Sequence, residues 1–210
     1  MSDNAPLPFI PFTQPSFDEA TIAAVAEVLR SGWVTSGPKL AEFEAALSAY
    51  FGNRPVRCFA NGTATMKIAL QVAGIGPGDE VITTTFTFIA TAEVIALLGL
   101  RPILVDVLED TMNINPEAIR KAITPKTKAI VPVHFTGYMT NMEKLLPIAN
   151  KYNLPIVEDA CQGILAAQNG KNAGTFGNCG AFSLHPLKNL NVWSDGGLII
   201  TDDQDLCNKL

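Results

Sequence analysis

The sequence predicts an α/β fold in which a mostly parallel β-sheet is sandwiched by helices. Short apolar runs, typical of buried strands, alternate with helical patterns along nearly the whole chain. Such alternation is the signature of a parallel sheet covered on both faces. With 210 residues, 48% of them hydrophobic, the chain is long enough to bury one substantial core. We therefore expect one large domain over residues 1–210, in which residues 1–15 form an N-terminal arm.

The expected elements follow one another in a regular order. Strands are predicted over residues 56–60, 80–83, 102–106, 128–133, 155–158, 180–184 and 197–201. Helices are predicted over residues 16–30, 38–51, 63–73, 89–98, 116–123 and 141–152, the first with a cap at its start and the fifth with Asn115 as its cap. The glycine-rich residues 74–78 follow a helix and precede a strand, so they indicate a tight turn and not a dinucleotide-binding loop.

Composition and charge exclude several classes of protein. The net charge is −5 and no basic run occurs, which argues against a nucleic-acid partner. The first eight residues lack the pattern of a signal peptide, and no apolar run approaches the ~20 residues of a membrane span. Cys58, Cys161, Cys179 and Cys207 form no CxxC pair, so we expect reduced thiols in a cytoplasmic protein. His134 and His185 share no metal-ligand spacing, and we expect structural roles for them and no metal.

Residues just after strands are the candidates for a site. Right-handed crossovers are expected to bring the carboxyl ends of all strands to one edge, where ligands of open α/β sheets bind. Gly62 and Thr63 follow a strand and open a helix, whose N-terminus favours phosphate. The alternative for these two residues is a simple capping turn.

Two charged residues follow later strands. Asp159 ends the run at 155–158, where its carboxylate is placed to pair with a cation; the alternative is an Asp that makes a turn or a cap. Lys188 follows the strand at 180–184 in an irregular stretch, where a partly buried amine acts as a nucleophile or base. The alternative is a solvated surface lysine. Residues 202–210 read as the start of a helix capped by Asp202 or Asp203, so we expect a piece of a longer protein.

Taken together and in this order, these signals resemble a known family. The matching motifs lie at residues 31–39, 76–82, 87–91, 132–134, 158–163, 183–188 and 195–197. From about residue 11 to residue 201 the chain resembles the fold-type-I enzymes that use pyridoxal 5'-phosphate (PLP), and within them the DegT/StrS sugar aminotransferases. It departs from that pattern at Asn61, where a Ser is common, and at residues 190–194, which are less rich in glycine.

The resemblance implies a role for each matching residue. Lys188 would form the internal aldimine with the cofactor and then move a proton, and Asp159 would pair with the pyridine nitrogen. Gln162 would reach the phenolic oxygen and Phe88 would lie against the ring face. The residues that would hold the phosphate are Gly62, Thr63 and Ser183.

It also implies an activity and partners. Members of the family move an amino group, usually from glutamate, to a nucleotide-linked keto-deoxysugar for polysaccharide or antibiotic biosynthesis. They act as homodimers and carry a small C-terminal domain, which we expect to be missing here. Related sugar dehydratases lack a lysine at the position of Lys188. Two alternatives remain open: a fold-type-I enzyme that acts on amino acids, and a truncated fragment without catalysis.

Overall fold

The computed structural model describes residues 9–11 and 13–210, and the chain divides into two compact units, Met1–Gly37 and Pro38–Leu210. The expected arm at residues 1–15 lies largely outside the described residues. In the smaller unit, helix α1 (Glu19–Ser31) begins later than predicted, because the side chain of Asp18 accepts the N–H of Thr21 at 2.7 Å and caps the helix.

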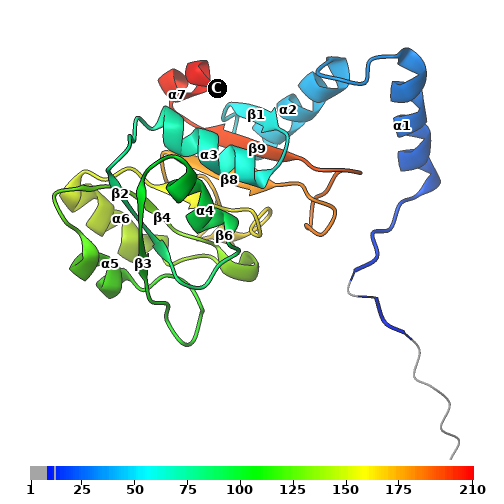
Figure 1. Ribbon diagram of the computed structural model, residues 1–210. Helices are drawn as coiled ribbons and strands as arrows, with labels where there is room; N and C mark the ends of the chain where they lie inside the picture. Colours follow the sequence, from blue (N-terminus) through cyan, green and yellow to red (C-terminus); the bar gives the residue numbers. More distant parts are fainter. Residues whose placement is uncertain (1–8, 12) are drawn as a thin grey trace, which may run out of the picture. The chain divides into compact units, whose positions relative to one another are not determined.

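The larger unit is built on one sheet (Figure 1). Its strands are β1 (Val56–Phe59), β2 (Glu80–Thr84), β3 (Arg101–Val105), β4 (Thr127–Val131), β5 (Val157–Asp159), β8 (Cys179–Ser183) and β9 (Gly197–Thr201). The strand orders are β3-β2-β4 and β5-β8-β9-β1. Two isolated parallel bridges, Ile130 to Ile156 and Val133 to Asp159, join β4 to β5. The α/β class with a mostly parallel sheet is therefore confirmed.

One strand contradicts the prediction that all carboxyl ends share an edge. Strand β9 runs antiparallel to both β8 and β1. The physical reason is that no helix lies between β8 and β9, so the chain returns beside the strand it has just left instead of crossing over the sheet. The other strands keep one direction, and the edge that carries Asp159 is the edge that the sequence indicated.

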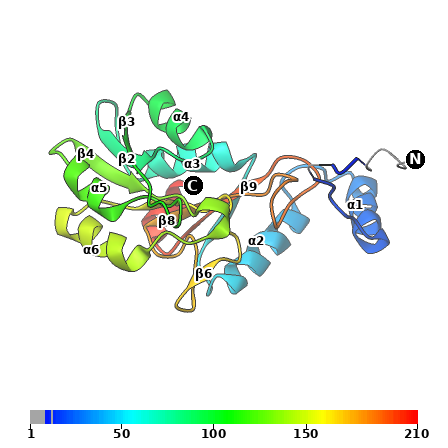
Figure 2. The ribbon, with the colours of Figure 1, turned by 90° about the horizontal axis from the view of Figure 1, so that it is seen from below.

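Helices cover both faces of this sheet (Figure 2). Their bounds are α2 (Pro38–Tyr50), α3 (Gly62–Val72), α4 (Ala90–Leu97), α5 (Pro116–Ala122), α6 (Met142–Tyr152) and α7 (Gln204–Lys209), with a short 3-10 turn, η1, at Phe135–Gly137. Asn115 caps α5 as predicted, and Asp203 caps α7. The sequence missed a small hairpin, β6 (Ala167–Gln168) and β7 (Lys171–Asn172).

Alternating residues of the strands pack into two separate hydrophobic cores, one on each face of the sheet. In β4, Ala129 and Val131 pack with α3 and α4, whereas Ile130 packs with α5 and α6. This alternation is the period of two expected of a strand, applied to a sheet with both faces buried. Apolar residues on both faces explain why the strands read as continuous hydrophobic runs.

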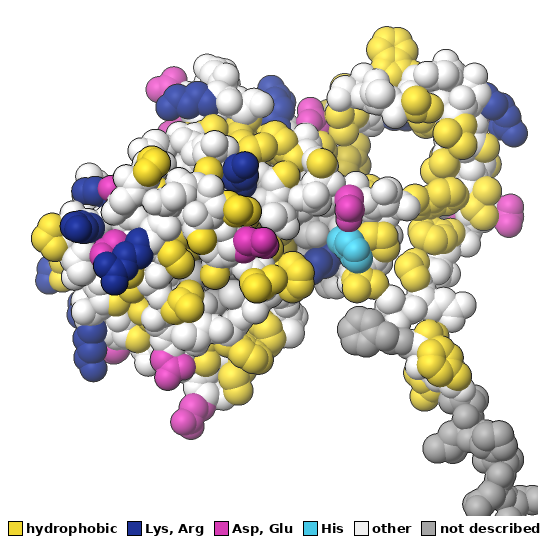
Figure 3. Space-filling model, in the orientation of Figure 1, with side chains coloured by type: hydrophobic (Ala, Val, Ile, Leu, Met, Phe, Trp, Pro, Cys, Tyr) yellow, Lys and Arg dark blue, Asp and Glu magenta, His cyan; other side chains and the backbone are white. Residues whose placement is uncertain are grey.

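The surface of the larger unit carries mixed charge. On the face that Figure 3 shows, acidic and basic side chains are interspersed, with hydrophobic side chains between them. Among the described residues, no helix has the length and apolar character needed to cross a membrane.

The buried thiol of Cys179 gives a testable dependence of stability on pH. Burial, with the negative charges of Glu158 and Asp203, raises the pKa of this thiol from 9.0 to about 12. Because the folded pKa lies above the unfolded one, this contribution to stability is complete below pH 9 and is lost as the pH rises toward 12. We expect the free energy of unfolding to fall by about 1 kcal/mol between pH 8.5 and 10 from this group. Urea unfolding at both pH values measures it, and Cys179→Ala should remove that part of the fall.

Candidate active site

A cavity of about 420 Å³ lies at the carboxyl ends of the parallel strands and brings the predicted residues together. It is lined by all seven side chains or backbone positions that the sequence indicated: Gly62, Thr63, Phe88, Asp159, Gln162, Ser183 and Lys188. They come from four separate segments of the chain. Their convergence is a consequence of the strand order, since β1, β5 and β8 all end at this edge.

The N-terminus of α3 forms one wall. The side chain of Asn61 accepts the N–H of Ala64 at 2.8 Å and caps the helix. The N–H groups of Gly62 and Thr63 have no hydrogen-bond partner among the described residues. A Cβ at Gly62 would lie 2.8 Å from the Cβ of Ser183 and 3.0 Å from the sulfur of Cys161. Glycine at this position therefore lets α3 approach β8 and leaves two free donors at a helix N-terminus.

Asp159 is held rigidly at the bottom of the cavity. Its side chain is buried, and one carboxylate oxygen accepts the hydroxyl of Thr91 at 2.7 Å. The other oxygen accepts the N–H of Cys161 at 3.2 Å. Thr91 is itself paired with the hydroxyl of Thr87 at 2.9 Å. The carboxylate keeps lone pairs that none of these donors uses, so it remains able to accept from a cation in the cavity.

Gln162 lines the cavity, and its side-chain oxygen is already engaged. Its side-chain oxygen accepts the backbone N–H of Thr136 at 2.9 Å. Thr136 lies in the η1 turn with a left-handed backbone, at φ 53°, beside Gly137. Because the oxygen is engaged, the amide N–H groups of Gln162 are the atoms left to donate to a ligand.

Lys188 lies in a turn that the end of β8 anchors. Its N–H donates to the carbonyl of His185 at 2.8 Å, and Asn191 donates to the carbonyl of Lys188 at 3.1 Å. Ser183 accepts the N–H of His185 at 3.3 Å, which leaves the hydroxyl proton of Ser183 free to donate. The Lys188 side chain is half-buried, so it is neither a solvated surface lysine nor a member of the core.

Among the other residues that line the cavity, three lie against the predicted ones and were given no part in the site from the sequence. Thr91 orients Asp159, Cys161 packs between Gly62 and β8, and His185 sits beside Lys188. Burial, with the nearby Asp159 carboxylate, raises the pKa of the Cys161 thiol well above its usual value, so this thiol stays protonated. Thr91 lay within a recognised motif, but its contact with Asp159 spans 68 residues and no local pattern signals it.

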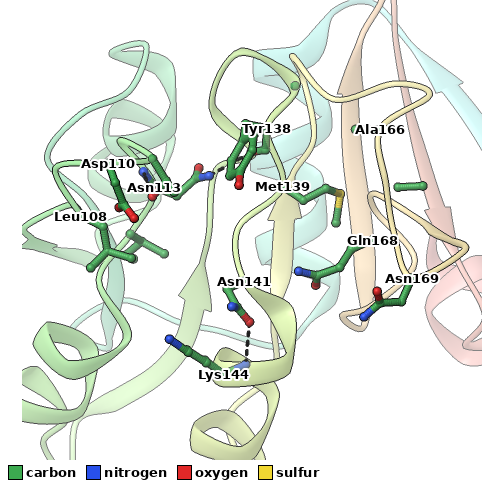
Figure 4. Close-up of a pocket in the computed structure, with 14 residues that line it drawn as sticks. Leu108, Asp110, Asn113, Tyr138, Met139, Asn141, Lys144, Ala166, Gln168 and Asn169 are labelled. Carbon is green, nitrogen blue, oxygen red and sulfur yellow. Dashed lines mark hydrogen bonds between the residues drawn. The ribbon is translucent and has the colours of Figure 1, made fainter.

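A second and larger cavity, of about 570 Å³, is built differently at its helix start (Figure 4). It also lies at the start of a helix, α6, and Lys144 lines it. There the side chain of Asn141 takes the N–H of Lys144, and that of Gln168 takes the N–H of Met142. The protein's own side chains thus take the first and third N–H groups of α6, whereas at α3 the first two N–H groups have no such partner in the described part of the chain.

The smaller cavity combines three features that suit one kind of ligand. Free N–H groups at the start of α3 suit a phosphate, the Asp159 carboxylate suits a protonated ring nitrogen, and the Lys188 amine suits an aldehyde. PLP carries all three groups. The fold and this cavity define the large domain of a PLP-dependent transferase of fold type I.

Comparison with known proteins identifies the family. Residues 15–210 match the DegT/DnrJ/EryC1/StrS aminotransferase family, and the chain belongs to it. The resemblance that the sequence motifs indicated is therefore confirmed.

Solved structures agree with this assignment. An aminotransferase from Psychrobacter cryohalolentis is 36% identical with a TM-score of 0.90, over 95% of this chain and 51% of that one. NtdA from Bacillus subtilis, solved with bound PMP, is 38% identical with a TM-score of 0.89, over 99% of this chain and 48% of that one. The GDP-4-keto-6-deoxymannose-3-dehydratase ColD, solved as a mutant with GDP-perosamine, is 27% identical with a TM-score of 0.89, over 94% of this chain and 53% of that one. The chain spans about half the length of these structures.

Proposed function

We propose that this chain forms the cofactor-binding part of a PLP-dependent aminotransferase, which transfers an amino group from glutamate to a nucleotide-linked keto-deoxysugar. The observation that carries the proposal is the convergence of Lys188, Asp159 and the free N–H groups of α3 on one cavity. Family membership supports the reaction class. The nucleotide-linked acceptor is supported by the GDP-sugar bound to ColD.

Each residue has a definite task in this proposal. When bound, PLP supplies an aldehyde that takes up the amino group and a ring that withdraws electrons from the substrate carbon. Lys188 would hold the cofactor through its amine, and the free amine would serve as the group that accepts and returns a proton. Asp159 keeps the ring nitrogen protonated, and Gln162 donates to the phenolic oxygen. Phe88 covers one ring face.

The phosphate is assigned to the start of α3. The N–H groups of Gly62 and Thr63 and the hydroxyl of Ser183 belong to residues that line the same cavity, and they have no acceptor among the described residues. Three donors together with the helix dipole suit a dianion. Phosphate held at this wall would orient the ring between Phe88 and Asp159.

Glycine at position 62 offers a direct test of the phosphate assignment. We expect Gly62→Ala to weaken PLP binding about tenfold, because the added Cβ would lie 2.8 Å from Ser183 and push α3 away from β8. Gly76→Ala is the matched control, since a Cβ there meets nothing within 4 Å and its φ is not positive. A spectrophotometric titration with PLP measures both. If Gly62→Ala binds PLP with unchanged affinity, the assignment of the phosphate to the start of α3 is wrong.

The second candidate is a sugar dehydratase, which the likeness to ColD favours. Lys188 argues for the aminotransferase, because the dehydratase relatives that the motifs resemble lack a lysine at this position. The two reactions leave different products, an amino sugar plus 2-oxoglutarate or a deoxygenated keto-sugar. Incubating the full-length protein with PLP, glutamate and a GDP- or dTDP-linked 4-keto-6-deoxysugar, with mass analysis of the sugar, decides between them.

We propose that the full-length protein is a cytoplasmic homodimer, with part of each site supplied by the neighbouring subunit. Large apolar side chains at and near the cavity support this, since Phe86, Phe88, Ile89 and Leu187 are 47%, 69%, 70% and 49% exposed. Light scattering on the full-length protein measures the mass. A monomer with full activity would contradict the proposal.

A further inference from the structure

A buried pair of side chains, His134 and Glu158, lies next to the cavity-lining residue Asp159 and has no part in the chemistry proposed above. The His134 Nε2 atom lies 2.8 Å from the Glu158 Oε2 atom, and both side chains are 0% exposed. Burying two such groups is costly unless their hydrogen bonds are complete. Their contacts show that they are.

The contacts fix the protonation of His134. Its Nδ1 atom accepts the backbone N–H of Thr140 at 3.2 Å, so that nitrogen carries no proton. The proton of the neutral ring is therefore on Nε2, which donates to Glu158. One ring thus makes two directed hydrogen bonds, one to the chain before α6 and one to β5.

Glu158 collects three further donors from a single loop. Its carboxylate accepts the N–H groups of Gly174 at 2.8 Å, Phe176 at 2.6 Å and Gly177 at 2.6 Å. The loop lies so close that a Cβ at Gly177 would be 2.5 Å from the carbonyl oxygen of Ile156. With His134 included, the carboxylate has four donors, which suits an anion in a buried position.

The pair spans the weakest join in the sheet. Strands β4 and β5 are connected by isolated bridges and not by a continuous ladder. Near the site the backbone bonds are the Asp159 N–H to the Pro132 carbonyl at 2.9 Å and the His134 N–H to the Asp159 carbonyl at 3.1 Å. The His134–Glu158 hydrogen bond is a side-chain tie across this same join.

Both cofactor-facing residues of this region depend on the join. Asp159 is the next residue after Glu158, and its backbone is the partner of His134. Thr136, two residues after His134, donates to Gln162. A shift of His134 would therefore move the carboxylate assigned to the ring nitrogen and the amide assigned to the phenolic oxygen.

We propose that His134 and Glu158 are positioning residues of the cofactor site, which hold the β4–β5 join so that Asp159 and Gln162 meet the cofactor ring together. This inference rests on the proposed function, because it takes the cofactor-facing roles of those two residues from it. The inference adds that PLP affinity depends on the hydrogen bond from His134 Nε2 to Glu158, which links the end of β4 to β5.

Two substitutions separate the two hydrogen bonds of His134. His134→Gln places an amide N–H near the position of Nε2 and retains a donor to Glu158. His134→Asn places an amide oxygen near the position of Nδ1 and retains an acceptor for Thr140, but it does not reach Glu158. In the full-length protein we expect His134→Asn to weaken PLP binding at least about tenfold and to shift the visible band of the bound cofactor. We expect His134→Gln to stay within about threefold of the unmodified protein.

A control variant separates positioning from simple loss of stability. Thr124→Val removes a 2.6 Å hydrogen bond to the buried Glu80, at the opposite end of the parallel strands. Thermal unfolding of the cofactor-free proteins shows how much each substitution destabilises the fold. We expect Thr124→Val to lower the melting temperature and to leave PLP affinity and the visible band unchanged.

The outcomes distinguish this inference from the proposed function. If His134→Asn destabilises the fold but binds PLP as the unmodified protein does, or if Gln and Asn have equal effects, the inference is overturned. Asp159→Asn is measured alongside. If it changes the cofactor spectrum while both His134 variants do not, the proposed function stands and the inference alone fails. If none of these variants alters PLP binding or its spectrum, the assignment of the cofactor to this cavity fails, and the inference with it.

Discussion

Lys188→Ala is expected to lower the rate of transamination by the full-length protein by about 10⁴-fold or more. Among the described residues that line the cavity, Lys188 carries the one amine. Its loss removes the covalent attachment and the group that moves the proton. The turn itself should persist, because its hydrogen bonds to His185 and Asn191 use backbone atoms of residue 188.

The decisive measurement is the visible absorption of the protein with PLP, before and after borohydride, beside the rate of 2-oxoglutarate formation from glutamate and keto-sugar. We expect a borohydride-sensitive band in the unmodified protein and none in Lys188→Ala. Lys144→Ala, which removes the lysine of the second cavity, is the matched control and should keep both the band and the rate. Near-normal turnover by Lys188→Ala would place the chemistry elsewhere.

The site residues that strand order alone indicated share one property: they lie at or just beyond the ends of strands, whereas Phe88, Gln162 and Ser183 came from the family resemblance. Thr63, Asp159 and Lys188 lie just beyond apolar runs, and the edge at which parallel strands end is fixed once the strand–helix alternation is recognised. Asn61 lies at the same kind of position, between the end of β1 and the start of α3. It stands where the family pattern has a Ser, yet its side chain caps α3 as a Ser would.

What the sequence could not indicate depends on contacts between distant segments. The direction of β9 is decided by the absence of a crossover helix between β8 and β9 and not by the residues of the strand. The hairpin β6–β7 has strands of two residues each, which are too short to show the apolar–polar alternation by which a strand is recognised. The pairing of His134 with Glu158 joins residues 24 apart across a bridge, and each residue alone looks like an ordinary polar residue after or within a strand.

Thr91 illustrates the same limit within the cavity. A threonine in the first turn of α4 has no local feature that sets it apart from a capping or surface residue. Its hydroxyl bonds to Asp159 only because the fold brings the first turn of α4 beside the last residue of β5. Residue types that carry chemistry are visible in a sequence, whereas the residues that orient them become visible only with the fold.

Asp159→Asn is expected to lower the rate of transamination by about 100-fold or more, with a much smaller effect on folding. The carboxylate is the group assigned to keep the ring nitrogen protonated, and a neutral amide cannot stabilise that positive charge. The fold should tolerate the change. The Thr91 hydroxyl can donate to an amide oxygen or accept from an amide nitrogen, so its 2.7 Å contact survives in either orientation.

This substitution separates two explanations of a buried aspartate at the end of a strand. If Asp159 merely closed a turn through its bond to the N–H of Cys161, the amide oxygen of Asn would replace it and activity would persist. If its charge serves the ring nitrogen, turnover falls while the melting temperature of the cofactor-free protein changes little. Asp106→Asn is the control: that aspartate also follows a parallel strand, bonds the adjacent N–H of Val107 at 2.8 Å and is exposed. A loss of rate in Asp159→Asn that Asp106→Asn does not share would assign the effect to the charge in the cavity, because both variants exchange the same carboxylate for the same amide after a strand of the same sheet.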